Sequence, residues 1–367
     1  MLAVKNLVRH RLRSALTLLG VAVSVALSFS LTTFADGLRG QVDDLLAANR
    51  IDLVIQMQNA STPMSSRLSP ADYAALNAMP EVAEVSGVLL GSMRVGLVQY
   101  TFIVGVDAVE PLAARLAFLK GGMFTPGKKE LILGANRAAK YRYELGKTMT
   151  LAQGETFTIA GIYQTGTALF DDAVAVSLSD ARRLLKRQDD YNLALVRLKK
   201  GLDQEAGAAA VQSLLPDLSA TPSGEMGTSV VLFRTVQAVT WIMSLIALAV
   251  SCLIVANTLI MSVAERTREL GVLMAIGWSR ARVVGMVLTE ALVLCLAGGA
   301  LGVALGYGLM QALTHSSVTG LDWVPPSFNL PLLARSMGLS LAVGLVASLV
   351  PAWLVTRLSP CEALRWE

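Results

Sequence analysis

Long stretches without charged side chains constrain this chain to a membrane-spanning fold. Ser14–Ala35 and Thr235–Ser262 contain no Asp, Glu, Lys or Arg, Val283–Ala312 contains only Glu290, and a fourth uncharged run follows at Ser336–Thr356. Each run is long enough for a helix to cross the ~30 Å of membrane hydrocarbon, which takes about 20 residues. At 54% hydrophobic residues the whole chain is also unusually apolar. The sequence therefore predicts four transmembrane helices.

The basic residues before the first run predict how the chain crosses the membrane. Residues 1–13 contain Lys5, Arg9, Arg11 and Arg13 but no acidic residue, and positive charge beside a span favours the cytoplasmic side. A cleaved signal peptide also begins with basic residues, but its apolar core is only about 7–15 residues long. The first run is longer, so we expect an uncleaved first span and both termini in the cytoplasm.

The hydrophilic stretch between the first two runs, residues 36–227, is predicted to form an extracytoplasmic α/β domain. Short β-branched or alternating stretches are typical of strands, and stretches that Ser or Asp opens are typical of helices. The expected strands are Asp52–Met57, Val88–Val98, Thr101–Val106, Glu130–Leu133, Thr156–Tyr163, Ala173–Ser177 and Leu193–Leu198. The expected helices are Ser69–Met79, Ser179–Arg187 and Asp203–Leu215, and Pro216–Gly227 is expected to be a linker loop. The fold class is thus four transmembrane α-helices plus one extracytoplasmic α/β domain between the first two.

No stretch of residues 36–227 has the pattern of an active site. Gly122–Lys129 nearly matches a phosphate-binding loop, but Lys129 stands where Ser or Thr must bind magnesium, so a turn is expected. The acidic pairs Asp171-Asp172 and Asp189-Asp190 have no common target, because adjacent side chains point apart, and exposed turn acids are expected. The stretch holds neither His nor Cys, which argues against an enzyme, a disulfide framework and a metal site.

A charged segment, Ala264–Arg282, separates the second run from the third. Leu270, Leu273 and Met274 recur in it at helical spacing, so the charged segment is predicted to form an amphipathic helix at the membrane surface. Gly277 is expected to end that helix. Two interpretations remain open, a connecting loop whose arginines only fix topology and a surface presented to a soluble partner.

These features divide the chain at the ends of the spans. The expected parts are 1–35 (basic N-terminus and first span), 36–227 (extracytoplasmic domain), 228–263 (second span with an outer helical extension), 264–282 (cytoplasmic charged segment), 283–312 (third span), 313–335 (outer loop), 336–357 (fourth span) and 358–367 (cytoplasmic tail). Arg335, at the outer end of the last span, is a minor exception to the charge rule.

Three parts of the chain resemble one transporter family. Glu265–Val283, ERTRELGVLMAIGWSRARV, resembles the loop of the MacB/FtsX-type ABC transporter permeases that docks on the ATPase subunit. The tail Pro351–Glu367, PAWLVTRLSPCEALRWE, resembles the family's closing pattern of Pro-Ala, a basic residue, Pro and Glu-Ala-Leu-Arg. Gly121–Lys140 and Thr156–Leu185 resemble the extracytoplasmic domain of the MacB type. The chain resembles a permease subunit without a fused ATPase domain.

The resemblance implies a site, partners and a location. Docking on the ATPase is assigned to Glu265, Arg266, Arg268, Glu269, Gly271 and Gly277. ATP and magnesium would bind in a separate ABC ATPase dimer, and this chain would bind no cofactor or metal and carry no catalytic residue. A second permease copy, favoured to be the same chain, and in some members a periplasmic adaptor protein would complete the assembly in the inner (cytoplasmic) membrane. The small net charge of +4 gives no support for nucleic-acid binding.

Two features of the third span point to helix packing and to a functional acid. Gly298, Gly302 and Gly306 are four residues apart and would line one helix face, where another helix of this chain or of a second copy can approach closely. Glu290 is the one acid inside a span, and an intramembrane ionisable group is a functional candidate. The resemblance implies a structural or coupling role for it and not proton transport.

The expected function is export driven by a partner. Four spans with one interior charge are too few for a usual solute channel, and the sequence holds no complete phosphate-binding loop. The resemblance implies mechanotransmission, in which ATP hydrolysis by the partner moves the extracytoplasmic domain and extrudes drug, peptide or lipid-linked cargo. The alternatives are FtsX-like transmembrane signalling to a cell-wall hydrolase and lipoprotein release from the inner membrane.

Overall fold

The computed structural model describes residues 11–95, 99–151, 154–226, 231–315 and 329–357. These residues fall into two units. The helical unit takes its described residues from Met1–Ala35, Gln237–His315 and Pro326–Glu367, and the sheet unit takes its residues from Asp36–Val236. The expectations for residues 1–10, for a helix start near Thr228, for most of the outer loop and for the tail from 358 lie outside the described residues.

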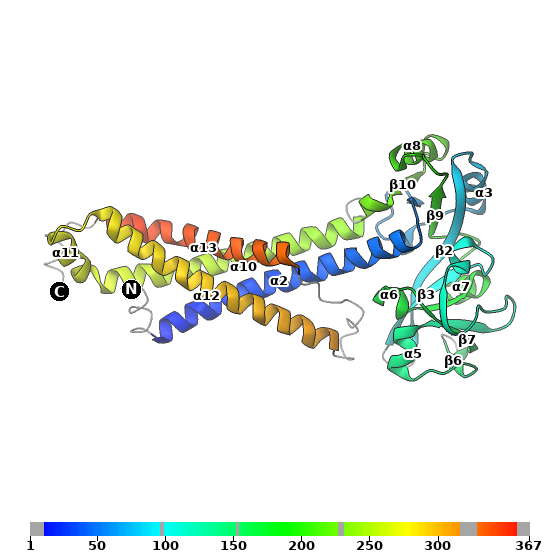
Figure 1. Ribbon diagram of the computed structural model, residues 1–367, viewed down its shortest axis with the longest axis horizontal. Helices are drawn as coiled ribbons and strands as arrows, with labels where there is room; N and C mark the ends of the chain where they lie inside the picture. Colours follow the sequence, from blue (N-terminus) through cyan, green and yellow to red (C-terminus); the bar gives the residue numbers. More distant parts are fainter. Residues whose placement is uncertain (1–10, 96–98, 152–153, 227–230, 316–328, 358–367) are drawn as a thin grey trace. The chain divides into compact units, whose positions relative to one another are not determined.

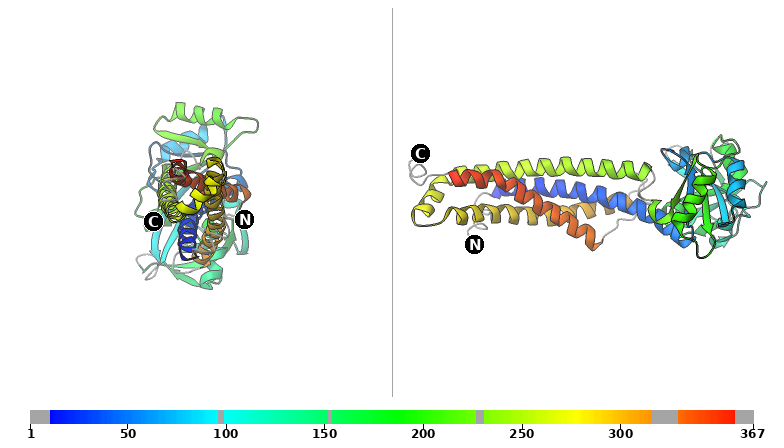
Figure 2. Two further views of the ribbon diagram at one scale, coloured as in Figure 1. Left: turned by 90° about the vertical axis from the view of Figure 1, so that its left-hand side faces the viewer. Right: turned by 90° about the horizontal axis from the view of Figure 1, so that it is seen from above.

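Long apolar helices build the helical unit (Figure 1). They are α2 (Arg11–Ala48), α10 (Val231–Glu265), α12 (Arg280–His315) and α13 (Leu330–Arg357), with the short α11 (Thr267–Ala275) between α10 and α12. Four helices of the described chain, these long ones, are long and apolar enough to span a membrane. Within the helical unit they are grouped together when seen nearly end-on in the left view of Figure 2, and they extend lengthwise in the right view. The predicted class of four spans with an α/β domain between the first two is thereby confirmed.

Hydroxyl side chains join α2 to α10 inside the helical unit. The hydroxyl oxygens of Thr17 and Thr258 are 2.7 Å apart, and the Ser28 hydroxyl donates a hydrogen bond to Ser244 Oγ at 3.0 Å. Hydrogen bonds of this kind stabilise helix pairs in lipid, where burying apolar surface between helices gives little driving force. The two helices are therefore held together at two levels along their length.

The glycine stripe of α12 packs against α2 of the same chain. A Cβ atom on Gly298 would lie 2.8 Å from Val21, and one on Gly302 would lie 2.6 Å from the carbonyl oxygen of Ala22. Gly306 faces α2 in the same way, with Ala26 oxygen at 2.9 Å from the Cβ position. Contacts this close are open only to glycine, so these three residues set the approach of α2 and α12.

A ten-stranded mixed sheet forms the sheet unit, in the order β10-β1-β9-β2-β3-β8-β5-β7-β4, with β6 paired to β7. The strands are β1 (Leu53–Met57), β2 (Val82–Val95), β3 (Gln99–Val106), β4 (Ala117–Gly121), β5 (Glu130–Gly134), β6 (Thr148–Thr150), β7 (Thr156–Gln164), β8 (Val174–Ser177), β9 (Leu193–Leu198) and β10 (Leu218–Pro222). The pairs β3 with β8 and β5 with β7 are parallel, and the other pairs are antiparallel. The α/β character predicted for this stretch is confirmed.

Both faces of the sheet are covered, because successive residues of its strands point to opposite sides. Leu90 of β2 packs on the face that the end of α2 covers through Leu46, whereas the adjacent Leu89 packs on the opposite face with Ala181 and Leu184 of α7. The short helices around the sheet are η1 (Pro63–Ser65), α3 (Pro70–Ala78), α4 (Pro111–Ala114), α5 (Ala135–Tyr141), α6 (Ala168–Asp171), α7 (Leu178–Leu184), α8 (Gln204–Leu214) and η3 (Ser223–Glu225). Apolar cores therefore cover both faces of the sheet.

The first long helix extends beyond the uncharged run that predicted it. That run ends at Ala35, but α2 continues to Ala48. Leu38, Val42 and Leu46 follow at helical spacing and pack in the core on one face of the sheet. The charged residues between them lowered the hydropathy of the stretch without breaking its helical pattern.

Two further details of the sheet unit differ from the sequence prediction. Pro216–Gly227 was expected to be a linker loop, but it contains β10, which pairs antiparallel with β1 at the sheet edge, and η3. The helix expected from Ser179 is α7, and its cap is Ser177, whose hydroxyl accepts a hydrogen bond from the Asp180 backbone N–H at 3.1 Å. Gly122–Lys129 is the expected turn between β4 and β5.

Candidate functional site

The charged segment, Ala264–Arg282, folds as α11 between the ends of α10 and α12. Arg266 interrupts the helical backbone with φ −111° and ψ 14°, which separates α10 from α11. The inner side of α11 is apolar, and its Leu270 is buried in the same core as Val263 of α10 and Val283 of α12. An amphipathic helix is thus present where the periodicity of the sequence predicted one.

A glycine ends α11 and turns the chain into α12. The backbone N–H groups of Gly277 and Trp278 donate to the carbonyl oxygens of Met274 at 3.1 Å and Leu273 at 3.0 Å. This is the Schellman arrangement, which needs a residue in the left-handed region directly after the helix. Gly277 supplies it with φ +102°, a conformation open to glycine at little cost.

An ion pair ties the start of the charged segment to the first helix. Arg13 of α2 donates two hydrogen bonds to the Glu265 carboxylate, Nη1 to Oε2 at 2.8 Å and Nη2 to Oε1 at 2.6 Å. The two side chains are 27% and 38% exposed, so water screens part of the attraction. The paired geometry of guanidinium and carboxylate fixes the relative orientation of the two helix ends more than it stabilises them.

A second ion pair ties the charged segment to α12. Arg266 lies with Nη1 3.8 Å from Glu290 Oε2, and its Nε donates to Glu269 Oε2 at 3.2 Å. Glu290 is only 8% exposed. Burial of a carboxylate is costly, and a cation beside it offsets part of that cost. The intramembrane acid predicted as a functional candidate thus lies beside the residue that separates α10 from α11.

The outward side of α11 combines charge with exposed apolar surface. Arg268 and Glu269 are exposed there. Val272 is 44% exposed and Ile276 is 69% exposed, although both are large apolar side chains. A charged rim around apolar residues is typical of surfaces that bind another protein.

The six residues expected to dock on the ATPase therefore have different surroundings, and one of them, Gly277, forms the exposed turn after α11. Arg268 and Glu269 lie on the outward side of α11, whereas Gly271 is buried. Glu265 and Arg266 pair with residues of α2 and α12. The exposed Val272 and Ile276 were missed, because in the sequence they are indistinguishable from the apolar residues of the inner side.

The acidic pair Asp171-Asp172 of the sheet unit is structural, whereas Asp189 of the other pair is exposed as expected. Asp171 was expected to be an exposed turn acid, but it is buried and accepts hydrogen bonds from the Thr165 backbone N–H at 2.6 Å and hydroxyl at 2.8 Å. Asp172 pairs with the buried Arg137 at 2.9 Å. In the described part of the chain, no group of three or more His, Cys, Asp or Glu residues could hold a metal ion.

Fold and site together define a multi-span membrane protein with an α/β domain between its first two spans and a short helix exposed between its second and third. Comparison with protein families gives this class a name. The model of the MacB-like periplasmic core domain matches residues 14–214, and that of the FtsX-like permease C-terminal region matches residues 241–360. The first match covers more than half of the chain, so the chain belongs to the MacB/FtsX-type ABC transporter permeases.

Several curated proteins are similar to nearly the whole chain. The pyoverdine export ATP-binding/permease protein PvdT of Pseudomonas syringae pv. syringae is 25% identical over 385 residues, which cover 98% of this chain and 58% of that protein. The macrolide export ATP-binding/permease protein MacB of Hahella chejuensis is 25% identical over 387 residues, with the same coverage of 98% and 58%. This chain therefore spans about 58% of the length of these relatives.

A solved structure is similar to part of the chain. The periplasmic region of MacB from Actinobacillus actinomycetemcomitans is 13% identical, with a TM-score of 0.41, and the match covers 50% of this chain and 94% of that one.

Proposed function

We propose that this chain is the membrane part of an exporter in which an ABC ATPase drives the motion of the extracytoplasmic domain. Membership of the permease family supports this proposal. The relatives are named as export proteins for pyoverdine and macrolides, which supports export over signalling. The cargo would be a drug, a peptide or a lipid-linked molecule. ATP and magnesium would bind in the ATPase, because the sequence holds no complete phosphate-binding loop.

The observation that carries the proposal is the outward side of α11. Val272 and Ile276 expose apolar surface at the end of two predicted spans, with Arg268 and Glu269 beside them. A partner that covers this surface would bury apolar area and meet two charges of opposite sign. We propose that the surface binds the ATPase on the cytoplasmic face of the inner membrane, with both termini on that side.

The ion pairs of the charged segment supply a route by which docking would move the helices. A displacement of α11 would be passed to α2 through Glu265 and Arg13, and to α12 through Arg266 and Glu290. Rigid helices joined by paired charges transmit small shifts without unfolding. A second copy of this chain and a periplasmic adaptor protein would complete the proposed assembly.

Copurification tests the proposed docking directly. The full chain is tagged, extracted gently from its native membrane and compared with the variants Arg268→Glu and Ile276→Asp. Both variants are expected to recover at least about tenfold less ABC ATPase, because truncation or reversal of a central interface residue weakens binding by ~2 kcal/mol or more.

The control variant repeats the change of charge of Arg268→Glu at a position outside the proposed surface. Lys200→Glu alters an exposed lysine of the sheet unit and is expected to recover the ATPase as the unmodified chain does. If both α11 variants recovered as much ATPase as the unmodified chain, the proposal that the ATPase docks on α11 would be wrong. Equal losses in all three variants would also count against it, because the effect would then follow charge and not position.

A further inference from the structure

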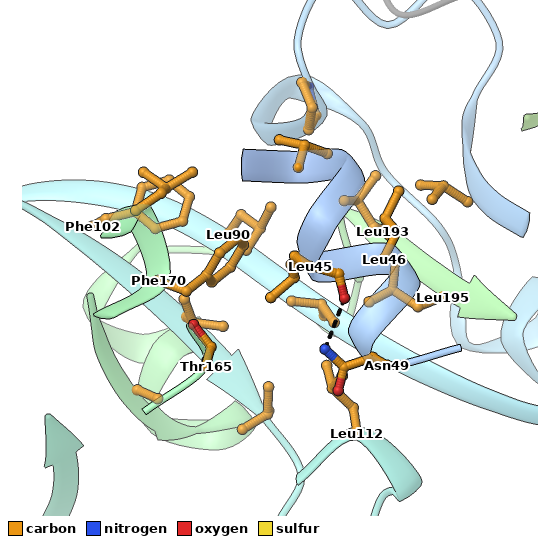
Figure 3. A pocket seen from close by; sticks show the side chains of 18 of the residues that line it. Leu45, Leu46, Asn49, Leu90, Phe102, Leu112, Thr165, Phe170, Leu193 and Leu195 are labelled. Atoms are coloured by element: carbon orange, nitrogen blue, oxygen red, sulfur yellow. Dashed lines mark hydrogen bonds between the residues drawn. The ribbon is translucent and has the colours of Figure 1, made fainter. Parts of the chain in front are cut away.

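An apolar cavity of about 430 Å³ lies within the sheet unit, between the last turns of α2 and one face of the sheet (Figure 3). Leu45 of α2 lines one side, and Leu90 of β2 and Leu195 of β9 line the sheet side. Leu112 of α4 and Phe170 of α6 lie on the remaining sides. The cavity is thus lined by elements from widely separated parts of the sequence.

The polar groups in the cavity wall already have partners. The Asn49 side-chain amide donates to the carbonyl oxygen of Leu45, in the last turn of α2, at 2.9 Å, as the dashed line in Figure 3 marks. The Thr165 hydroxyl is 2.8 Å from Asp171 Oδ1, and the Tyr163 hydroxyl donates to the carbonyl oxygen of Phe170 at 2.9 Å. A buried water usually needs two to four polar partners. The cavity is therefore suited to an apolar ligand and not to water.

The size of the cavity exceeds that of a packing defect. A cavity of ~150 Å³ with an apolar lining is already large enough to hold benzene. At about 430 Å³, this cavity falls in the range of ~300–1,000 Å³ that is usual for small-molecule sites. A ligand that covers this apolar lining would supply the contacts that its side chains otherwise lack.

The wall that α2 contributes to the cavity is elongated. The residues of α2 that line it run from Leu38 to Leu46, about 12 Å along the helix at ~1.5 Å per residue. An elongated apolar ligand that lies along this wall would contact α2 over about two turns of the helix.

We propose that this cavity is a binding site for the acyl chain of a lipid. The ligand would lie along α2 and fill the space between that helix and the sheet. The helix that forms this wall continues toward the N-terminus as the first predicted span. A ligand that binds here would therefore contact the extension of a membrane helix. This inference goes beyond the export function and does not require docking of an ATPase.

Photochemical labelling of the full chain in lipid nanodiscs tests the proposal. One sample contains palmitic acid with a diazirine on its chain, and a second contains phosphatidylcholine with the same group on one acyl chain. After irradiation, the labelled peptides are identified by mass spectrometry. Labels are expected in the peptides around Leu45, Leu90 and Leu112, in addition to those of the spans. The sample that gives them tells whether a free fatty acid or a membrane lipid supplies the chain.

Two variants narrow the cavity from different elements. Leu45→Trp enlarges a side chain on α2, and Leu112→Trp enlarges one on α4. Each is expected to lower labelling of the sheet unit at least fivefold and to leave labelling of the spans unchanged, which serves as the internal reference. Val109→Trp adds the same ring at a side chain that is 85% exposed and should change neither.

The folding of each variant is checked by thermal unfolding, and either narrowing variant alone suffices if the other fails to fold. If neither probe labels the sheet unit of the unmodified chain, the proposal is overturned. It is also overturned if a folded narrowing variant is labelled as strongly as the control.

Discussion

Glu110 lies at the start of α4. Its side chain is buried, and burial raises its pKa to about 7, with a smaller contribution from the nearby Asp107 carboxylate. The Tyr73 hydroxyl donates to Glu110 Oε1 at 3.0 Å, and this hydrogen bond together with one from the Gly87 backbone lowers the pKa only in part. Its other carboxylate oxygen is buried without a hydrogen-bond partner. The neutral acid is therefore the form that this site favours.

The raised pKa of Glu110 predicts that the protein loses stability as the pH rises. The folded state binds the proton more tightly than the unfolded chain, so this stabilisation is complete below about pH 4.5 and is lost as the pH passes about 7. The free energy of unfolding should fall by up to about 3 kcal/mol over this interval, at ~1.4 kcal/mol per pKa unit. Thermal unfolding of the Glu110→Gln variant between pH 5 and pH 8 should show a flatter profile, because Gln cannot ionise.

An exposed glutamate provides the control for this pH dependence. Glu205→Gln removes a carboxylate from the surface of α8 and should leave the profile of the unmodified protein intact. Parallel profiles for Glu110→Gln and the unmodified protein would show that another group titrates.

The partners of single charged residues were the least predictable part of the site. The sequence marked Glu290 as an unusual acid, because it stands alone among apolar residues. It gave no sign that Arg266 would lie beside it, since that contact depends on the break in the backbone between α10 and α11. Asp171 was expected at the surface because the sequence likewise gave no sign of its partners. Its hydrogen bonds come from the backbone and hydroxyl of Thr165, and a search for side-chain patterns does not detect such bonds.

At the level of helices, the packing of α12 on α2 rests on glycine. Gly302→Ala is expected to destabilise the helical unit, because the added Cβ would lie 2.6 Å from the Ala22 carbonyl oxygen, and backbone must then move. Overpacking of this kind typically costs about 1–3 kcal/mol. The loss in the free energy of unfolding is measured by unfolding the protein in mixed micelles that contain an increasing share of a denaturing detergent.

Gly308 of the same helix is the matched control for this substitution. A Cβ atom there would meet nothing within 4 Å, so Gly308→Ala should be neutral or slightly stabilising. If Gly302→Ala weakened only a dimer and left the unfolding of each chain unchanged, the stripe would belong to an interface between copies.

Secondary structure was predictable where the pattern of residues was regular and long. The spans and the central strands follow from uncharged runs and from β-branched stretches, because burial on both sides leaves no room for charge. β10 was missed, since it is a short edge strand that ends in Pro222 and depends on β1 for its hydrogen bonds. The extension of α2 to Ala48 was missed because its apolar residues contact a sheet that is formed later in the sequence.

At the scale of the whole molecule, the order of spans and domain was predictable, but the cavity was not. Its wall combines residues of α2, β2, β9, α4 and α6, and each of these residues is an ordinary apolar side chain in its own element. Only their arrangement leaves space between them. The exposed apolar side of α11 is a second such feature, because exposure depends on which neighbours a helix has and not on its composition.

The ion pair between Arg13 and Glu265 joins the first helix, which also lines the cavity, to the charged segment. If this pair transmits motion, Arg13→Glu and Glu265→Arg should each slow ATP hydrolysis by the copurified complex, and the double variant that exchanges the two charges should restore it. The loss in each single variant should be modest, about fivefold or less, because both side chains are partly exposed and such pairs contribute ~1 kcal/mol or less. The amount of ATPase recovered should stay constant in all three, since neither residue belongs to the proposed docking surface.

A double variant as slow as the single variants would show that the position of each charge matters and not their pairing. Normal rates in both single variants would show that α2 follows the charged segment without this contact.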